Sequence, residues 1–295
     1  MVTISGGRDS TYILHQMAKV YKMHVLACSF DCGIQSELGK RNTKKICAEL
    51  GVDLVIVPYK AKKNREMIRH NFMAWIRKPT VAMIPLLMLA DKTMDYHMKK
   101  TAKQHGIKLI INGDSQVEYS LFKSGFLGVD ATSHGRNIPL TQKLKLLWNY
   151  AKEYIRNPRY LSNLYDSLTG FFVYFYADKL FKDVRIINYF DYILWNEDDI
   201  VKTNLSMGWE LPTDTILTWR NDDAMPPLYN YLYLRMVGFT ENDTLRSNMI
   251  REGMMGREEA LEITKLENRP RMETLLKLMV DLDIPYKLLE RVPKL

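Results

Sequence analysis

Short apolar stretches alternate with amphipathic stretches through the first 112 residues of the chain, and this alternation restricts the possible folds more than any other feature. The apolar stretches predict four strands, at Val2–Ile4, His24–Phe30, Asp53–Val57 and Lys108–Asn112. The amphipathic stretches predict helices at Ser10–Val20, Ser36–Leu50, Arg65–Ile76 and Val81–Gln104. Strands separated by helices pair in parallel through right-handed crossovers. The sequence therefore predicts an α/β fold with a doubly wound parallel sheet.

A fifth strand is expected at Val184–Tyr189, which makes the predicted sheet five-stranded. Beyond it the pattern is mainly helical, with helices expected at Leu228–Val237, Thr244–Glu252, Arg257–Leu266 and Arg271–Leu282. We therefore predict an α/β domain with a helical insertion over residues 1–200. A helical C-terminal region over residues 201–295 would follow it and contact a substrate or partner.

The first predicted strand is short, because only Val2–Ile4 precede a pair of glycines. Strands in globular proteins average about five to six residues. The sequence therefore predicts either a shortened chain or an unusually short first strand.

Composition narrows the class of protein. Lysine and arginine exceed aspartate and glutamate by 42 − 34 = 8, which favours anionic partners such as nucleotides, sugar nucleotides or RNA. The three cysteines form no C-x-x-C pair, which argues against a disulfide framework and against a cysteine-based zinc or iron–sulfur site. The longest apolar run, Leu168–Phe181, is too short to span a bilayer and predicts a buried helix. Without an evident signal peptide, we expect a cytoplasmic protein with no membrane partner.

The segment Ser5-Gly6-Gly7-Arg8-Asp9-Ser10 joins the first predicted strand to the first predicted helix. Adjacent glycines let backbone N–H groups approach an anion, and the helix N-terminus adds partial positive charge. Serine hydroxyls and the forked cation of Arg8 suit phosphate oxygens, while Asp9 would cap the helix or help to hold Mg²⁺. The segment matches neither the Walker nor the G-x-G-x-x-G pattern. It predicts a phosphate-binding loop, with a plain Gly-Gly turn as the alternative.

Polar residues also follow two other predicted strands, at the edge where parallel sheets bind ligands. Phe30 and Asp31 stand at the end of the second strand and are candidate ligand contacts, with a plain turn as the alternative for Asp31. After the fourth strand, Gly113 would let the backbone approach the nucleotide. Asp114 and Glu118 would bind Mg²⁺ or orient a second substrate, with a solvated acidic rim as the alternative.

The C-terminal third adds two candidate binding residues. Arg251 and Arg257 would bind a substrate phosphate, with ion pairs to Glu258 or Glu259 as the alternative. The polar and aromatic segment Trp219–Asp223 also stands out, but the sequence assigns it no role.

The glycine-containing loop resembles the PP-loop of the ATP pyrophosphatase superfamily, with Arg8 where lysine is more common. The resemblance implies a five-stranded parallel sheet, binding of ATP with Mg²⁺, and cleavage between the α- and β-phosphates. It also implies that Phe30 and Asp31 contact the nucleoside of ATP. Ser5, Gly6, Gly7, Arg8 and Ser10 would hold the β,γ-phosphates and the departing pyrophosphate, and Arg8 would stabilise charge on the leaving group. A substrate oxygen would be adenylated, and a nucleophile would then displace AMP.

A closer resemblance is to the N-acetyl sugar amidotransferases of polysaccharide and lipopolysaccharide biosynthesis. The stretches that carry it are SGGRDSTYILHQM, FDCGIQSELGKRNTKKICAELGVDLVIV, LIINGDSQVEY, MGWE and YLYLRMVGFTENDTLRSNMIREGMMGREEAL. The last stretch holds the family pattern at Gly238-Phe239, Ser247–Gly253 and Arg257–Ala260. The resemblance implies that an acetamido group on a nucleotide-linked sugar becomes an acetamidino group, with ammonia from a separate glutaminase and synthase pair. We regard a homodimer as possible for this chain, and we do not expect nucleic acid as a partner.

Two other functions are alternatives. A PP-loop sulfurtransferase acting on tRNA or a small molecule would need a reactive cysteine, and only Cys32 lies near the expected site. The second alternative is a non-catalytic ATP-binding subunit. The intact loop and the acidic residues after the fourth strand argue against it.

Overall fold

The computed structural model describes residues 1–295 except 89–92, 121, 130–138 and 295. The chain divides into two units, and each is assembled from three segments. Unit 1 contains residues 1–65, 90–116 and 169–226, and unit 2 contains residues 66–89, 117–168 and 227–295. The units are therefore interleaved along the chain, whereas the sequence predicted consecutive domains that meet at residue 200.

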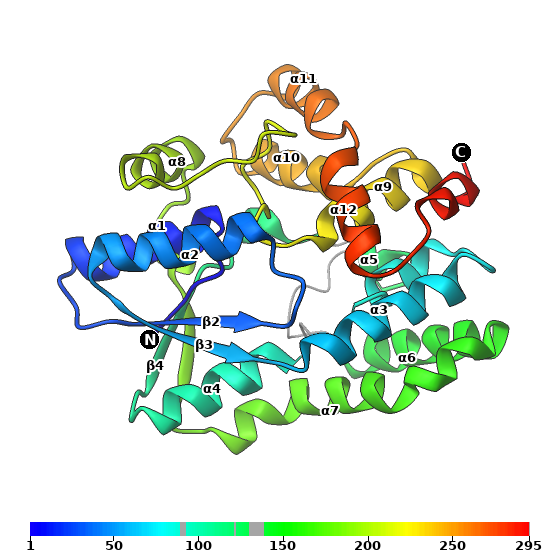
Figure 1. The fold of residues 1–295 in the computed structure, drawn as a ribbon, viewed down its shortest axis with the longest axis horizontal. Helices are drawn as coiled ribbons and strands as arrows, with labels where there is room; N and C mark the ends of the chain where they lie inside the picture. The colour runs from blue at the N-terminus through cyan, green and yellow to red at the C-terminus, as the bar shows by residue number, and fades with distance from the viewer. Residues whose placement is uncertain (89–92, 121, 130–138, 295) are drawn as a thin grey trace. The chain divides into compact units, whose positions relative to one another are not determined.

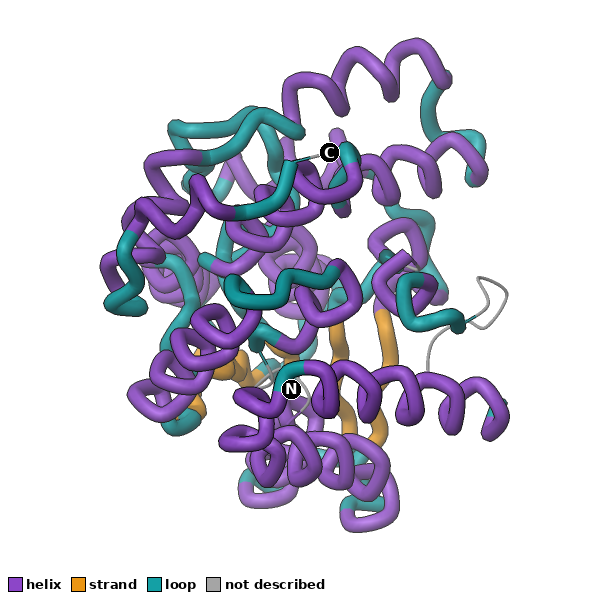
Figure 2. Tube along the Cα trace, turned by 90° about the vertical axis from the view of Figure 1, so that its right-hand side faces the viewer, coloured by secondary structure: helices purple, strands orange, loops and turns teal. Residues whose placement is uncertain are grey.

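Unit 1 contains a five-stranded, all-parallel sheet in the order β3-β2-β1-β4-β5 (Figure 1). The strands are β1 (Val2–Thr3), β2 (Leu26–Asp31), β3 (Asp53–Pro58), β4 (Leu109–Asn112) and β5 (Arg185–Asn188). All five predicted strands are confirmed, and the first is two residues long. Val2 nevertheless pairs on both sides, with Ala27 of β2 and with Ile111 of β4, so β1 is central. In Figure 2 the strands lie side by side in orange.

Helices lie on both faces of this sheet, consistent with a doubly wound arrangement (Figure 1). On one face are α1 (Arg8–His15), which continues into a π-helical turn (Gln16–Val20), and α2 (Glu37–Leu50). On the other face, α4 (Met94–Gln104) packs Met98 and Ala102 against Cys28 and Ile110. The remaining helices with residues in unit 1 are α8 (Glu197–Ser206), the first turn of α3 (Ala61–Trp75) and the end of α7 (Leu164–Leu180).

Local signals set the ends of α2 as the sequence predicted. The Ser36 hydroxyl accepts a hydrogen bond from the Gly39 N–H at 2.9 Å and caps the N-terminus. Gly51 ends the helix in the left-handed conformation, with φ of +66°. The predicted helix Val81–Gln104 is wrong in its first part. Residues Val81–Leu86 form a 3₁₀ helix that contains Pro85, which has no N–H to donate, and α4 begins only at Met94.

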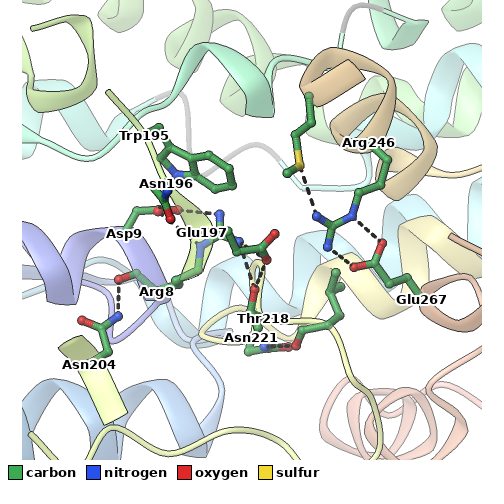
Figure 3. Close-up of polar contacts among 12 residues, drawn as sticks. Arg8, Asp9, Trp195, Asn196, Glu197, Asn204, Thr218, Asn221, Arg246 and Glu267 are labelled. Carbon is green, nitrogen blue, oxygen red and sulfur yellow. Dashed lines mark hydrogen bonds and ion pairs between the residues drawn. The ribbon is translucent and has the colours of Figure 1, made fainter. Parts of the chain in front are cut away.

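Unit 2 is helical. Its helices are α5 (Phe122–Gly125), α6 (Leu140–Arg156), α10 (Glu241–Arg251), α11 (Arg257–Glu267) and α12 (Met272–Asp281), with 3₁₀ helices at Val81–Leu86, Pro158–Asn163 and Tyr286–Arg291. Helix α9 (Met225–Val237) begins at the end of unit 1 and continues in unit 2. The four predicted C-terminal helices are confirmed within three residues at each end. A buried ion pair between Arg246 and Glu267 joins α10 to α11 (Figure 3).

The structure tests the predicted buried helix at Leu168–Phe181 only in part, because the side chains of residues 171, 172, 174 and 175 lie outside those described. The segment is helical within α7, but the side chains of Leu168, Tyr176 and Leu180 are exposed. Among the helices that the structure describes, none is long and apolar enough to cross a membrane.

Candidate functional site

The loop of residues 5–10 follows β1, the central strand of the sheet in unit 1. The strand order places β2 on one side of β1 and β4 on the other, so β1 lies at the topological switch point. Ligands of open α/β sheets bind at such a point, outside the carboxyl ends of the strands. Gly6 has a φ of +83°, in the region that favours glycine, and residues 8–10 form the first turn of α1. The predicted strand–loop–helix arrangement is therefore confirmed.

Side chains from three other segments hold the carbonyl groups of this loop. The bonds run from Gln35 Nε2 to Ser5 O (2.7 Å), from Trp209 Nε1 to Gly6 O (2.8 Å) and from Asn204 Nδ2 to Arg8 O (2.7 Å; Figure 3). The C=O and N–H of one trans peptide unit point in opposite directions. Fixing each carbonyl therefore also fixes the next residue's N–H, which is turned away from the donor.

Three backbone amides of the loop have no acceptor among the described residues. Within the described residues, the backbone N–H groups of Gly6, Asp9 and Ser10 donate no hydrogen bond. Those of Gly6 and Asp9 belong to peptide units whose carbonyls are held by Gln35 and Asn204. At the N-terminus of α1 these donors combine with the partial positive charge of the helix. The loop is thus a candidate anion cradle.

The Arg8 guanidinium is buried in a network of its own (Figure 3). It donates to both Asp9 carboxylate oxygens (3.2 and 3.0 Å), to Glu197 Oε1 (2.9 Å) and to Thr218 Oγ1 (3.0 Å). It also lies over the Trp195 ring, with its Cζ atom 4.7 Å from the ring centroid. These four bonds use four of the five guanidinium N–H groups. Because the Arg8 side chain is buried and bonded to Asp9, Glu197 and Thr218, the geometry favours Arg8 as a positioning residue.

The residues predicted to hold Mg²⁺ do not form a preassembled metal site. Both Asp9 oxygens accept hydrogen bonds from Arg8, and Oδ1 also accepts from Trp195 Nε1 at 2.9 Å. Asp114 is exposed, and its carboxylate accepts from Asn112 Nδ2 at 3.0 Å. Across the described residues, no group of three or more histidine, cysteine, aspartate or glutamate side chains is arranged to hold a metal ion.

Asp222, to which the sequence assigned no role, lies against the loop. A Cβ atom placed on Gly7 would lie 2.7 Å from Asp222 Oδ1, and the Ser5 side chain hydrogen-bonds to the same carboxyl group. The backbone is fixed as well, because Asp222 O accepts from the Ser36 N–H at 2.7 Å. Burial raises the pKa of Asp222, and the nearby charge of Asp9 raises it further. The site thus contains an enclosed carboxyl group beside the anion cradle.

Gly113 lies at the open end of α1. A Cβ atom at this position would be 3.1 Å from Ile13 Cδ1 and 3.4 Å from the Ser10 nitrogen, one of the open amides. A side chain here would cover part of the cradle. The end of β4 therefore lies close to the loop, and approach of the Gly113 backbone to a nucleotide stays a prediction.

The two residues predicted at the end of β2 differ in their surroundings. The Phe30 ring packs against the rings of Tyr59 and His97, with centroids 5.5 and 5.7 Å away. The Asp31 carboxylate accepts from the Gly33 N–H at 2.8 Å, which is the turn that the sequence gave as an alternative. Contact of either residue with a nucleoside stays a prediction.

The other predicted site residues belong to unit 2. Glu118 ends a 3₁₀ helix at Gln116–Glu118. Arg251 and Arg257 are both exposed, and Arg251 donates to Asn248 Oδ1 at 2.6 Å. The alternative of ion pairs with neighbouring glutamates is not seen for either arginine among the described contacts.

The cysteines offer little nucleophilic character. All three are buried thiols, and burial raises the pKa of Cys28 and of Cys47 to about 11. The thiolate is the reactive form, so neither group is suited to sulfur transfer near neutral pH. Cys32 is the remaining candidate for that chemistry.

The raised pKa of Asp222 leads to a prediction about stability. Because the folded protein binds this proton more tightly than the unfolded chain does, stability falls as pH rises from the ordinary value of 3.8 through the raised pKa. We expect Asp222→Asn to be more stable than wild type near neutral pH, with the difference shrinking toward about pH 4. Urea denaturation across this pH range measures it, with exposed Asp53→Asn as the control. A variant no more stable than wild type at neutral pH would contradict this assignment.

Comparison of the sequence with models of known protein families and with curated proteins finds no match. The function is therefore argued from the geometry of the loop and its surroundings.

Proposed function

We propose that the protein is an enzyme of the ATP pyrophosphatase type, which binds the phosphates of ATP on residues 5–10 and adenylates an oxygen of a second substrate. The observation that carries this proposal is the set of open amides at Gly6, Asp9 and Ser10. The Gly6 and Asp9 amides are oriented by Gln35 and Asn204, which bond the carbonyl groups of the same peptide units. Donors held in advance bind developing phosphate charge without a cost of reorganisation.

Within this class we favour an amidotransferase acting on a nucleotide-linked sugar. The acetamido oxygen would attack the α-phosphorus of ATP while the bond to the β-phosphate breaks and pyrophosphate leaves. Ammonia would then add to the activated carbon, and AMP would leave with the former amide oxygen and release of a proton, giving an amidine. The support for this substrate and for a glutaminase and synthase pair is the sequence resemblance. Mg²⁺ would be held mainly by the ATP phosphates, as is usual for this ion.

The residues around the loop would have different roles in the reaction. Arg8, Asp9 and Glu197 would hold the first turn of α1 in place, and the loop amides would contact the phosphates. Asp114 and Glu118 stay candidates for orienting the second substrate. Arg251 and Arg257 stay candidates for binding a substrate phosphate.

A substitution of Asn204 tests whether the held carbonyls matter. We expect Asn204→Leu to weaken ATP binding by about tenfold or more, because Arg8 O loses its donor and the Asp9 N–H is no longer oriented. Asn149→Leu is the matched control, since Asn149 Nδ2 donates to Leu127 O at 2.6 Å in unit 2. Titration calorimetry with ATP and Mg²⁺ compares the two variants. Equal ATP affinity for both variants would argue against the cradle.

The products of the reaction test the activity itself. Incubation with ATP, Mg²⁺, an ammonium salt and an acetamido sugar nucleotide should release AMP and pyrophosphate in equal amounts, and the sugar should gain one nitrogen in place of oxygen. Formation of ADP and phosphate would contradict the proposed bond cleavage. ATP binding without sugar conversion would retain the cradle and reject the proposed acceptor.

A further inference from the structure

Helix α6 in unit 2 has one face that is held by contacts with the rest of the unit. Asn149 Nδ2 donates to Leu127 O at 2.6 Å, and the Thr80 hydroxyl donates to Glu153 Oε2 at 3.2 Å. Burial raises the pKa of Tyr150 on the same face. These contacts fix the rotation of the helix about its axis, so they also fix which residues face outward.

The outward face of α6 is apolar. Its large side chains, with their exposed fractions, are Leu140 (71%), Leu144 (56%), Leu147 (39%), Trp148 (61%) and Ile155 (74%). At 3.6 residues per turn these positions fall within an arc of about 100°. Isolated exposed apolar residues are common on proteins, but a continuous stripe on one helix indicates an interaction surface.

Positive charge borders this stripe on one side. Lys145 and Lys152 are exposed on the adjoining part of the helix, and the Lys152 ammonium lies 5.5 Å from the centre of the Trp148 ring. Arg156 is exposed there as well and also pairs with Glu153 at 3.7 Å. The sequence of α6 contains a single acidic residue, Glu153, which is on the inward face. The outward surface of α6 is therefore apolar and cationic.

We propose that α6 docks on the surface of a bilayer that contains anionic phospholipid, lying in the plane of the interface. Apolar residues on one face with lysines and arginines at its margin are the pattern of interfacial helices. Tryptophan is favoured at the boundary between headgroups and acyl chains, where Trp148 would lie. The cations would contact lipid phosphates.

Charge favours this occupant over a second copy of the chain. A two-fold dimer with its α6 helices antiparallel would bring two identical cationic margins together, and like charges repel. The proposal departs from the prediction of no membrane partner, which rested on the lack of a segment able to span a bilayer. An interfacial helix needs no spanning segment. The proposed docking of α6 on a membrane is independent of the proposed ATP chemistry.

Trp148 provides a direct measurement on the full-length protein. The other four tryptophans, Trp75, Trp195, Trp209 and Trp219, are buried. With vesicles of phosphatidylglycerol and phosphatidylcholine, we expect Trp148 fluorescence to shift to shorter wavelength and to be quenched by brominated acyl chains. With phosphatidylcholine alone, binding should be at least about tenfold weaker.

Exposed substitutions separate the apolar and cationic contributions without disturbing the fold. Leu144→Ser with Ile155→Ser, and separately Lys145→Gln with Lys152→Gln, should each reduce vesicle binding by about tenfold. Val280→Ser, an exposed position on α12, is the control and should bind as wild type does. The proposal is overturned if wild type does not bind the anionic vesicles, or if both double variants bind them as tightly as wild type does. It is also overturned if light scattering shows a dimer that the Leu144→Ser and Ile155→Ser substitutions dissociate. ATP affinity should be unchanged in all variants.

Discussion

Replacing Arg8 with alanine is expected to lower the free energy of unfolding by about 3–5 kcal/mol, the usual effect of removing one partner from a buried ion pair. The substitution would leave the carboxylates of Asp9 and Glu197 without their shared cation. Trp195 would also lose the guanidinium that lies over its ring. From the loop motif alone one expects lost turnover in an intact fold. The structure leads us to expect a fold that is itself weakened.

Urea denaturation followed by circular dichroism measures this loss. Arg41→Ala is the matched control, because Arg41 also pairs with a carboxylate, Glu210 at 3.3 Å, but on the exposed surface of the same unit. Exposed pairs contribute about 0–1 kcal/mol, so this variant should unfold almost as wild type does. A similar, small effect for both variants would show that Arg8 is not a structural anchor and would return it to the role of a phosphate ligand.

Much of unit 1 follows from local sequence. Each strand is a short apolar run between turn residues, and the ends of α2 are set by Ser36 and Gly51. Such signals act within a few residues, so they can be read before the fold is known. Which of the described side chains of α7 are exposed could not be predicted in this way. Its composition is apolar, but the exposure of Leu168 and Tyr176 depends on which segments pack against the helix.

In the candidate site, too, some features follow from local sequence and others depend on contacts made by the fold. The loop motif predicted the strand–loop–helix arrangement of the candidate anion cradle, because glycine conformation and a helix N-terminus are local properties. The groups that orient the loop come from residues 35, 204 and 209, and the groups that bind Arg8 come from residues 195, 197 and 218. No spacing rule links these positions to residue 8. Trp209 had one signal, since it belongs to the MGWE stretch of the sequence resemblance.

Gly6→Ala should remove the cradle altogether. The φ of +83° costs a non-glycine residue about 1–2 kcal/mol, and the added methyl group would overlap the carbonyl oxygen of Gly39 and lie 2.9 Å from Thr43 Oγ1. Forced overpacking of this kind costs a further 1–3 kcal/mol, roughly. Since Gly39 belongs to the capped first turn of α2, the loop must move instead. We expect a loss of about 2–5 kcal/mol in stability and, because a displacement of about 1 Å at a reacting centre can cost 100-fold, a loss of that order in pyrophosphate release.

Gly51→Ala separates the two contributions to this loss. Gly51 also has a positive φ, +66°, but a Cβ atom there meets nothing within 4 Å. It should therefore show the conformational cost alone, about 1–2 kcal/mol, with unchanged affinity for ATP. The difference between the two variants then measures how closely the loop is packed on α2. If Gly6→Ala bound ATP as tightly as Gly51→Ala, the loop would be free to relax, and a cradle fixed in advance by its neighbours could not be the source of phosphate affinity.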